Sequence, residues 1–493
     1  MTAEEADINE TPVAGPVLLA RGTASTTTRL SALVVTADHQ NPPDLAPEDQ
    51  DAVTPLALAT AFGWTVWRYD FALLQKAGGA RYALYGQSWR VQTDPNANNF
   101  RIGYVSCNGF EGEDLFHPAP DRNVLWRRLL DGHGAQPLTL LLHGGDQFYA
   151  DGVWHCHPEL AGWDDLNEDH QLSKPLSNEA FEAARHFYWS HYIRLLSQPE
   201  VAPLVAEVPS LMMWDDHDIF DGWGSHGDGL QQSQIWQGVY AAAREGFLLF
   251  QLGGTDEHPP TICEDRDAPG GPQQFGWCCR YGETAIVAPD LRAERTAHRV
   301  MGDGGWTAIN RWKRELTDCR RVFVMSSVPA LGPRLSWIER TMLMLPRAQR
   351  YEDDLRDQWQ SRAHRREWQA FLQTWLDLMA AGPDVTLISG EIHLATRGEM
   401  HDGARKLHQL VASGIAHPPP PTAYARVLGG LAWLGEAPLT AHPIMMRPLP
   451  GRRYIYTNIR NYLMLERTAE GWSAWWEIET DGASAHLTLG KDR

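Results

Sequence analysis

The sequence has few cysteines and no long apolar segment. Its 493 residues include six cysteines, and none of these is spaced as a Cys-x-x-Cys pair. A disulfide framework or a structural zinc site is therefore not expected, and sparse cysteine suits a reducing compartment. No run of roughly 18 apolar residues occurs, so we expect no membrane span. The first residues, MTAEEADINE, lack the basic and apolar regions of a secretory signal, which predicts a cytoplasmic protein.

Positive charge is also scarce. The chain carries 43 lysines and arginines against 62 aspartates and glutamates, for a formal net charge of -19. An acidic surface repels phosphate backbones, so we expect no general nucleic-acid binding. A small phosphate ester held by metal ions is still compatible with this charge, because bound cations can reverse the local field. These totals leave the oligomeric state open.

The length exceeds what one hydrophobic core usually supports, so we expect more than one domain. We predict a disordered N-terminus over residues 1–15. Residues 16–95 show strand patterns, for example at 27–35, 64–71 and 81–93, and contain no strong helical pattern. This region is predicted to be an N-terminal β-sandwich. The turn-forming sequence DPNANN at 94–99 then leads into a second domain over residues 100–493.

In this second domain, short apolar runs are followed by polar loops and then by helical patterns, which is typical of an α/β sheet. We predict core strands at 101–105, 138–142, 210–214, 321–325 and 385–388, helices at 124–130, 181–196, 233–249 and 351–380, and late strands at 406–411, 454–465 and 472–479. Ligands of such sheets lie beyond the carboxyl ends of the strands. We therefore expect the polar residues after these strands to converge on one edge.

The first polar loop, GGDQFYAD, directly follows the apolar run LTLLL. Its glycines allow a sharp turn and a close approach to a ligand. Asp146 could bridge two hard cations, and Tyr149 could supply a phenolate to a ferric ion. The alternative is an ordinary turn in which Asp146 caps the next segment.

The second loop, WDDHDIFD, holds four carboxylates and one imidazole within seven residues, at Asp215, Asp216, His217, Asp218 and Asp221. Their mutual repulsion needs an offset, and a multivalent cation is the natural one. A solvated acidic loop is the competing interpretation. The apolar residues within and beside the loop indicate instead that it packs against protein, which favours a metal site.

The third loop, SGEIH, follows the strand at 385–388, and its Glu391 and His393 could both point into one site. Mixed carboxylate and imidazole ligation suits iron, manganese or zinc. Cys107, at the end of the strand at 101–105, could bind iron as a thiolate. Each of these residues has a structural alternative: a lone histidine is often structural, and a lone cysteine is often a small core residue.

Together, GDxxY after a strand, then WDDHD, then SG(D/E)xH resemble the PhoD-like alkaline phosphatases, a branch of the calcineurin-like metallophosphoesterases. The resemblance covers about residues 17–466, and three motifs in order make it specific. It implies an α/β fold in which a calcineurin-like four-layer α/β/β/α core is preceded by an N-terminal β-sandwich. It also implies a metallophosphoesterase that hydrolyses phosphate monoesters or diesters.

Carried over to this chain, the resemblance implies two or more metal ions, with iron plus calcium favoured and manganese or zinc as alternatives. The implied metal ligands are Cys107, Asp146, Tyr149, Asp216, Asp221, Glu391 and His393. The implied catalytic residues are His217, which would protonate the leaving oxygen, and Asp215, two residues before it. In the family, aspartate usually stands at the position of Glu391, and asparagine often stands at the position of Asp221.

The mechanism that we expect is in-line attack on phosphorus by a metal-bound hydroxide, with His217 as the general acid. Arg397, Arg452 and Arg460 are candidate phosphate clamps. The alternative function is a non-catalytic metal-binding scaffold that retains the fold. The feature that favours this alternative is Glu391, which stands where the family usually has aspartate. A carbohydrate-binding N-terminal module would require Trp64, Trp67 and Trp89 to be exposed, and core packing is the favoured reading for these residues.

Overall fold

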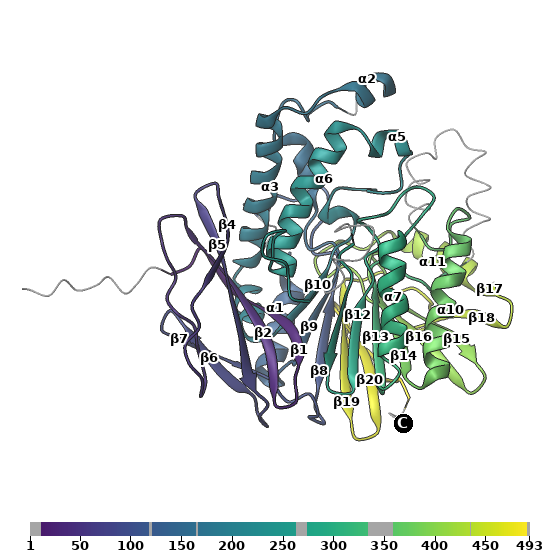
Figure 1. The fold of residues 1–493 in the computed structure, drawn as a ribbon. Helices are drawn as coiled ribbons and strands as arrows, with labels where there is room; N and C mark the ends of the chain where they lie inside the picture. The colour runs from purple at the N-terminus through teal and green to yellow at the C-terminus, as the bar shows by residue number, and fades with distance from the viewer. Residues whose placement is uncertain are drawn as a thin grey trace, which may run out of the picture.

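The computed structural model describes residues 11–117, 121–163, 166–262, 274–333, 358–433 and 435–490. Two large β-sheets form the centre of the molecule, and helices lie on both sides of them (Figure 1). The helices are α1 (Val124–Ala135), α2 (Glu168–Ser173), α3 (Asn178–Leu196), α4 (Ala202–Glu207), α5 (Asp228–Gln231), α6 (Gln234–Gly246), α7 (Asp303–Glu315), α10 (Arg365–Ala381) and α11 (Thr422–Ala432). Across these residues, no helix combines the length and the apolar character that crossing a bilayer requires.

The first sheet has eleven strands in the order β21-β20-β19-β8-β9-β10-β1-β2-β5-β4, with β22 paired to β20. Its central strands β8, β9 and β10 run parallel. The strands are β1 (Ala14–Thr23), β2 (Thr27–Ala37), β4 (Leu56–Ala61), β5 (Trp64–Leu74), β8 (Arg101–Val105), β9 (Leu140–Gly144), β10 (Ser210–Met213), β19 (Asn461–Thr468), β20 (Gly471–Ile478), β21 (Gly482–Ala483) and β22 (Leu487–Thr488).

The second sheet has eight strands in the order β11-β12-β13-β14-β16-β15-β18-β17. Its strands are β11 (Trp277–Tyr281), β12 (Thr284–Ala288), β13 (Arg321–Ser326), β14 (Asp384–Ser389), β15 (Thr396–Asp402), β16 (Arg405–Val411), β17 (Glu436–Leu439) and β18 (His442–Arg447). Strands β12, β13, β14 and β16 are parallel neighbours. Both faces of β13 are buried, as its continuous apolar run predicts.

Alternate residues of β13 enter two different cores. Phe323 belongs to the large cluster that also contains Leu141 and Leu463 of the first sheet, and its ring centroid lies 4.9 Å from that of Trp472 in β20. Val322 and Val324 belong to a second cluster with residues of α7 and α10. The two sheets therefore face each other across one core, while α7 and α10 cover the outer face of the second sheet (Figure 1).

The N-terminal strands differ from the expected arrangement. Strands β1, β2, β5 and β4 continue the first sheet, because β1 pairs in parallel with β10. A small sheet of β3 (Ala46–Pro47), β6 (Ala80–Leu84) and β7 (Gln87–Val91) packs on them around a third apolar cluster. A separate N-terminal β-sandwich is thus not confirmed, and the division at residues 16–95 and 100–493 stays a prediction. Of the segment predicted to be disordered, residues 1–10 lie outside the described part, and Ala14 and Gly15 already belong to β1.

Several element boundaries also differ from the sequence-based expectation. The alternating segment at 81–93 is a hairpin, β6 and β7, that turns at Tyr85 and Gly86. The first part of the helix predicted at 351–380 lies outside the described residues up to 357, and α10 begins at Arg365. The strand predicted at 454–465 begins only at Asn461. Strands β11, β12 and β15 and helix α7 were not predicted.

Candidate metal centre

The predicted metal-binding loops meet between the two sheets. Cys107, Asp146 and Asp216 follow β8, β9 and β10 of the first sheet, whereas His393 follows β14 of the second sheet. The expectation that all these loops share one sheet edge is therefore wrong. Because the two sheets face each other, the carboxyl ends of strands from both sheets deliver donor atoms to the same place.

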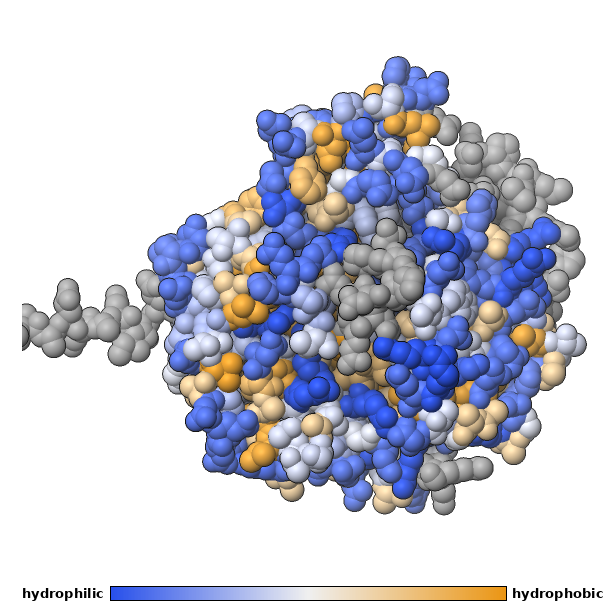
Figure 2. Space-filling view, viewed as in Figure 1, coloured by the Kyte–Doolittle hydropathy of each residue, from blue (hydrophilic) through white to orange (hydrophobic). Residues whose placement is uncertain are grey.

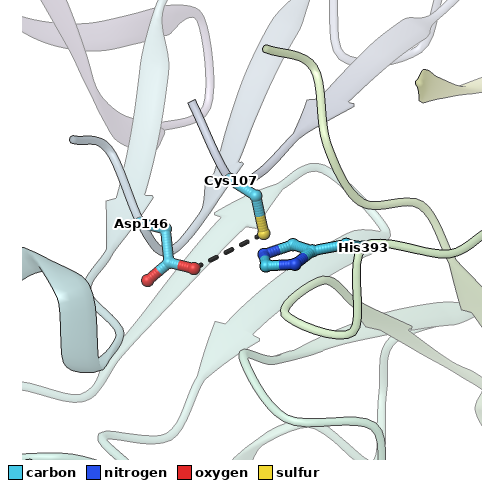
Figure 3. A group of neighbouring side chains, drawn as sticks. All are labelled: Cys107, Asp146 and His393. Atoms are coloured by element: carbon cyan, nitrogen blue, oxygen red, sulfur yellow. Dashed lines mark hydrogen bonds between the residues drawn. The ribbon is translucent and has the colours of Figure 1, made fainter. Parts of the chain in front are cut away.

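Cys107, Asp146 and His393 form one group of possible metal ligands (Figure 3). Each offers one ligand atom, and these atoms lie within 4.8 Å of one another. The Cys107 thiol Sγ lies 3.4 Å from Oδ2 of Asp146 and 3.1 Å from Oγ of Ser413. Nε2 of His393 lies 2.9 Å from the hydroxyl oxygen of Tyr149. Three of the predicted ligands therefore lie together, and a fourth, Tyr149, contacts one of them.

Asp146 also belongs to a second group, with Asp215 and Asp216. Its Oδ1 atom is buried and has no hydrogen-bond partner among the described residues. Burial, reinforced by the charge of Asp215, raises the pKa of the Asp146 carboxyl well above its usual range. A buried carboxylate oxygen without a partner is costly, and a shared cation between the two groups would offset that cost.

The backbone is strained at the same place. Among the described residues, seven non-glycine residues have positive φ, and four of them are predicted ligands: Cys107, Asp146, Glu391 and His393, with φ between 52° and 62°. Such conformations cost free energy and tend to gather at functional sites. Gly144 allows the close packing beneath this loop, because a Cβ there would lie 1.9 Å from the hydroxyl oxygen of Tyr104.

His217 lies against the first group. Its Nδ1 is 3.0 Å from Oδ2 of Asp151, its Nε2 is 4.0 Å from Oδ1 of Asp221, and its ring centroid is 4.0 Å from that of Tyr149. Burial alone would favour the neutral ring, but the negative charges of Asp151 and Asp216 raise the pKa of His217 well above its ordinary value. The ring can therefore hold a proton beside the metal-binding groups.

Asp215 is held in place by an arginine of the protein. It forms a buried ion pair with Arg292, and Nη2 of Arg292 also lies 3.3 Å from Oδ1 of Asp216. Both partners are almost fully buried, with side-chain exposures of 0% for Arg292 and 1% for Asp215. Asp218 accepts hydrogen bonds from the backbone N–H groups of Asp215 and Gln147, at 2.9 Å each. In the acidic loop, Asp215 and Asp218 thus have protein partners that hold the loop in place.

The structure brings together most, but not all, of the predicted site residues. Asp221 joins Asp216 and His217 in a third group, although its side chain is 65% exposed. Glu391 belongs to none of the three groups found among the described residues. Its Oε1 accepts a hydrogen bond of 2.8 Å from Nε2 of Gln358. The longer side chain of Glu391 therefore contacts Gln358, in the segment that precedes α10, and does not join the other carboxylates in these groups.

Two residues of the site were missed from the sequence. Asp151 stands in the GGDQFYAD motif, and its position two residues after Tyr149 was the only signal. His417 had none, because it lies in a proline-rich loop. Its ring stacks on that of His393 with centroids 3.4 Å apart, and its Nδ1 lies 2.6 Å from the carbonyl oxygen of Pro418. The contact with Pro418 places the proton on Nδ1 and leaves Nε2 as an acceptor.

The three arginines considered as phosphate clamps each pair with a carboxylate. Arg397 pairs with Glu399, Arg452 with Asp481 and Arg460 with Glu479. The tryptophans of the N-terminal region are half-buried. Trp64 stacks on His186 and Trp89 on Tyr82, and Nε1 of Trp67 donates to Thr36, so the exposed aromatic platform that a carbohydrate-binding module needs is not present among them.

The donor set fits metal ions. Thiolate, phenolate, imidazole and carboxylate together suit iron or another transition metal, and the all-carboxylate group suits a harder cation. Burial raises the pKa of Cys107 and of Tyr149 well above their ordinary values, with further contributions from neighbouring acidic groups. A bound cation would favour the deprotonated forms of both groups.

Comparison with known proteins agrees with this geometry. The profile of the PhoD related phosphatase family matches residues 68–351, more than half of the chain. The fold is similar to that of PhoD, with a TM-score of 0.58 and 12% identity over 98% of this chain and 92% of that structure. It is also similar to the purple acid phosphatase PPD1 of yellow lupin, with a TM-score of 0.53 and 10% identity over 97% and 74% of the two chains.

This chain belongs to the PhoD-related phosphatase family, and its mixed α/β fold is that of the metallophosphoesterases. It is 24% identical over 437 residues to YGR266W, an uncharacterised protein of Saccharomyces cerevisiae. The match covers 71% of this chain and 61% of the yeast protein, so the chain spans about three fifths of that relative's length.

Proposed function

We propose that this protein hydrolyses phosphate esters at a centre of two or more metal ions held between its two sheets. The observation that carries the proposal is the position of Asp146, which belongs both to the group with Cys107 and His393 and to the group with Asp215 and Asp216. A carboxylate shared by two ligand groups is what a bridged metal pair needs.

In this proposal, Cys107, Asp146, Tyr149 and His393 would hold one ion, and iron suits these donors. Asp146 and Asp216, with Asp221 at the exposed rim, would hold a second ion such as calcium, with manganese or zinc as alternatives. Bound cations would supply Lewis acidity at phosphorus and neutralise charge on the ester oxygens.

The protein's own residues would then supply the proton to the leaving oxygen. His217 would protonate the leaving oxygen of the ester, and Asp151 would hold the imidazole in the required orientation. Arg292 would keep Asp215 and Asp216 aligned without touching the ester. Asp215 is therefore better regarded as a positioning residue than as the catalytic group that its place in the motif suggested.

We further propose the four-layer α/β/β/α arrangement of the core, which is supported by the two facing sheets and by the separate helix clusters on each side. A cytoplasmic location remains part of the proposal. The ester is either a monoester or a diester, and the arrangement of the described side chains is compatible with both.

The test combines metal analysis of the purified chain with hydrolysis of a nitrophenyl phosphate monoester and of the corresponding bis-ester. We expect about two metal ions or more per chain, and hydrolysis that a chelator abolishes and added metal restores. Comparing the two esters assigns the substrate class. A chain that binds metal but hydrolyses neither ester under any reconstitution would support the scaffold alternative, for which the displaced Glu391 is the structural argument.

A further inference from the structure

Helix α11 exposes an apolar surface beside the candidate metal centre. Ala425 and Ala432 pack into the buried cluster of the second sheet, but the outer side chains Tyr424, Val427 and Trp433 are 53%, 66% and 82% exposed. Among the described residues, seven large apolar side chains are exposed, and four of them lie here when Tyr454 is included. The other three, Val13, Phe116 and Leu172, lie far apart in the sequence. The face of the molecule that Figure 2 shows is largely hydrophilic, with small and separate apolar patches.

Arginines border this surface. The guanidinium of Arg426 lies 2.9 Å from the ring centroid of Tyr454, and that of Arg453 lies 5.5 Å from the same centroid. Both arginines are exposed. We define the α11 surface as Tyr424, Arg426, Val427, Trp433, Arg453 and Tyr454.

The charge of this part of the chain is opposite to that of the whole. Residues 403–465 contain seven lysines and arginines but one acidic residue, Glu436, in a chain whose net charge is -19. Five of these cations pair with carboxylates outside the segment, namely Arg405, Lys406, Arg447, Arg452 and Arg460, so the positive border of the α11 surface consists of Arg426 and Arg453. The side chain of Glu436 is 6% exposed, and its carboxylate lies 3.5 Å from Arg365. The α11 surface is therefore apolar with a positive border, and it offers no exposed carboxylate of its own.

The α11 surface is also close to the site. Its helix begins five residues after His417, which stacks on His393. Thr457, three residues after Tyr454, pairs with Ala395, two residues after His393. Nδ2 of Asn458 donates to Oγ1 of Thr422 at the start of α11. Both segments of the α11 surface are thus tied to the loop that carries a predicted metal ligand.

We propose that the α11 surface docks on an anionic phospholipid bilayer. Tryptophan and tyrosine are the side chains that prefer the boundary between lipid and water, and a surface helix with an apolar outer face can lie in that boundary. Arginines beside it are attracted to anionic headgroups, whereas the rest of this acidic protein is repelled. This last step rests on the proposed function: docking would bring the metal centre close to phosphoesters displayed at the lipid surface.

The experiment measures co-sedimentation of the full-length protein with vesicles of phosphatidylcholine alone and of phosphatidylcholine mixed in equal parts with phosphatidylserine. We expect binding to the mixed vesicles that weakens with added salt. The apolar variant Val427→Ser/Trp433→Ser should lose on the order of tenfold or more in partitioning. The charge variant Arg426→Gln/Arg453→Gln should lose about fivefold per arginine. Leu172→Ser, an exposed apolar residue on α2, is the matched control and should bind as the wild type does.

Two results would overturn the proposal. One is that the wild-type protein does not bind the mixed vesicles, or that both double variants bind them as well as the wild type does. The other is that the wild-type protein binds no vesicles and forms an oligomer in sedimentation equilibrium, and that Trp433→Ser dissociates this oligomer. The α11 surface would then be a protein interface. Because vesicle binding is measured without hydrolysis, a chain that binds vesicles but hydrolyses no ester would contradict only the proposed function.

Discussion

Nδ1 of His217 lies 3.0 Å from Oδ2 of Asp151, a residue 66 positions earlier in the chain. The same carboxylate accepts the backbone N–H of Asp221 through its other oxygen at 2.9 Å. Burial works against ionisation of Asp151, but the charge of His217 and these hydrogen bonds lower its pKa below the ordinary value. Asp151 is therefore the ionised partner that fixes the orientation of the His217 imidazole.

If His217 protonates the leaving oxygen, replacing Asp151 should harm poor leaving groups most. We expect Asp151→Asn to lower kcat by roughly 10²–10⁴-fold on an alkyl phosphate, which needs the proton. The loss on a nitrophenyl phosphate should be much smaller, because nitrophenolate leaves without a proton. The measurement is kcat on both esters at equal metal content. An equal loss on the two substrates would mean that Asp151 has only a structural role, and Asp151→Glu should restore part of the difference.

Asp146 should affect stability and metal binding in opposite directions. Asp146→Asn removes a buried carboxyl group whose ionisation is disfavoured by burial and by the charge of Asp215, so we expect the metal-free protein to be unchanged or more stable by about 1 kcal/mol. Metal content should fall, and hydrolysis should fall by at least roughly 100-fold. Denaturant unfolding in chelator and metal analysis measure the two effects. Asp131→Asn, on the exposed side of α1, is the control and should change neither quantity.

The buried ion pair between Arg292 and Asp215 should be necessary for folding stability. Arg292→Met leaves Asp215 without its guanidinium partner in a site that is 1% exposed, and we expect a loss of about 3–5 kcal/mol in the free energy of unfolding. The exposed pair of Arg280 and Asp318, at 42% and 66% exposure, is the comparison. Arg280→Met should cost less than about 1 kcal/mol. Similar losses in both variants, measured by denaturant unfolding in chelator, would contradict this reading of Arg292.

Acid should destabilise the second sheet through His408 of β16. Burial, only partly offset by Glu399, lowers the pKa of His408 from 6.5 to about 4. The folded state disfavours the charged ring of His408. The free energy of unfolding is therefore highest above pH 6.5, where the ring is neutral in both states, and it decreases as the pH falls toward 4. The full effect is roughly 3 kcal/mol. His408→Gln should flatten the decline in the free energy of unfolding over this range, and an unchanged slope would show that His408 does not cause it.

Much of the architecture followed from local patterns. The apolar runs at 101–105, 210–214 and 321–325 became β8, β10 and β13, because strands buried on both faces need continuous apolar sequence. The pair β11 and β12 escaped prediction. Their sequences WCCRY and TAIVA are short, and only their pairing with each other and with β13 makes them strands. The N-terminal strands were recognised, but their membership of the large sheet depends on the pairing of β1 with β10.

The candidate site shows the same division. The sequence by itself determined which donor groups follow buried strands, since Cys107, Asp146, Asp216 and His393 all stand a few residues after the end of an apolar run. Only the tertiary structure decided that these groups come from two facing sheets, that Asp151 and Arg292 hold His217 and Asp215, that His417 joins the site, and that Glu391 turns to Gln358. Hydrogen bonds and ion pairs depend on separations of about 3 Å between atoms, and distant segments reach such separations only when the whole core has packed.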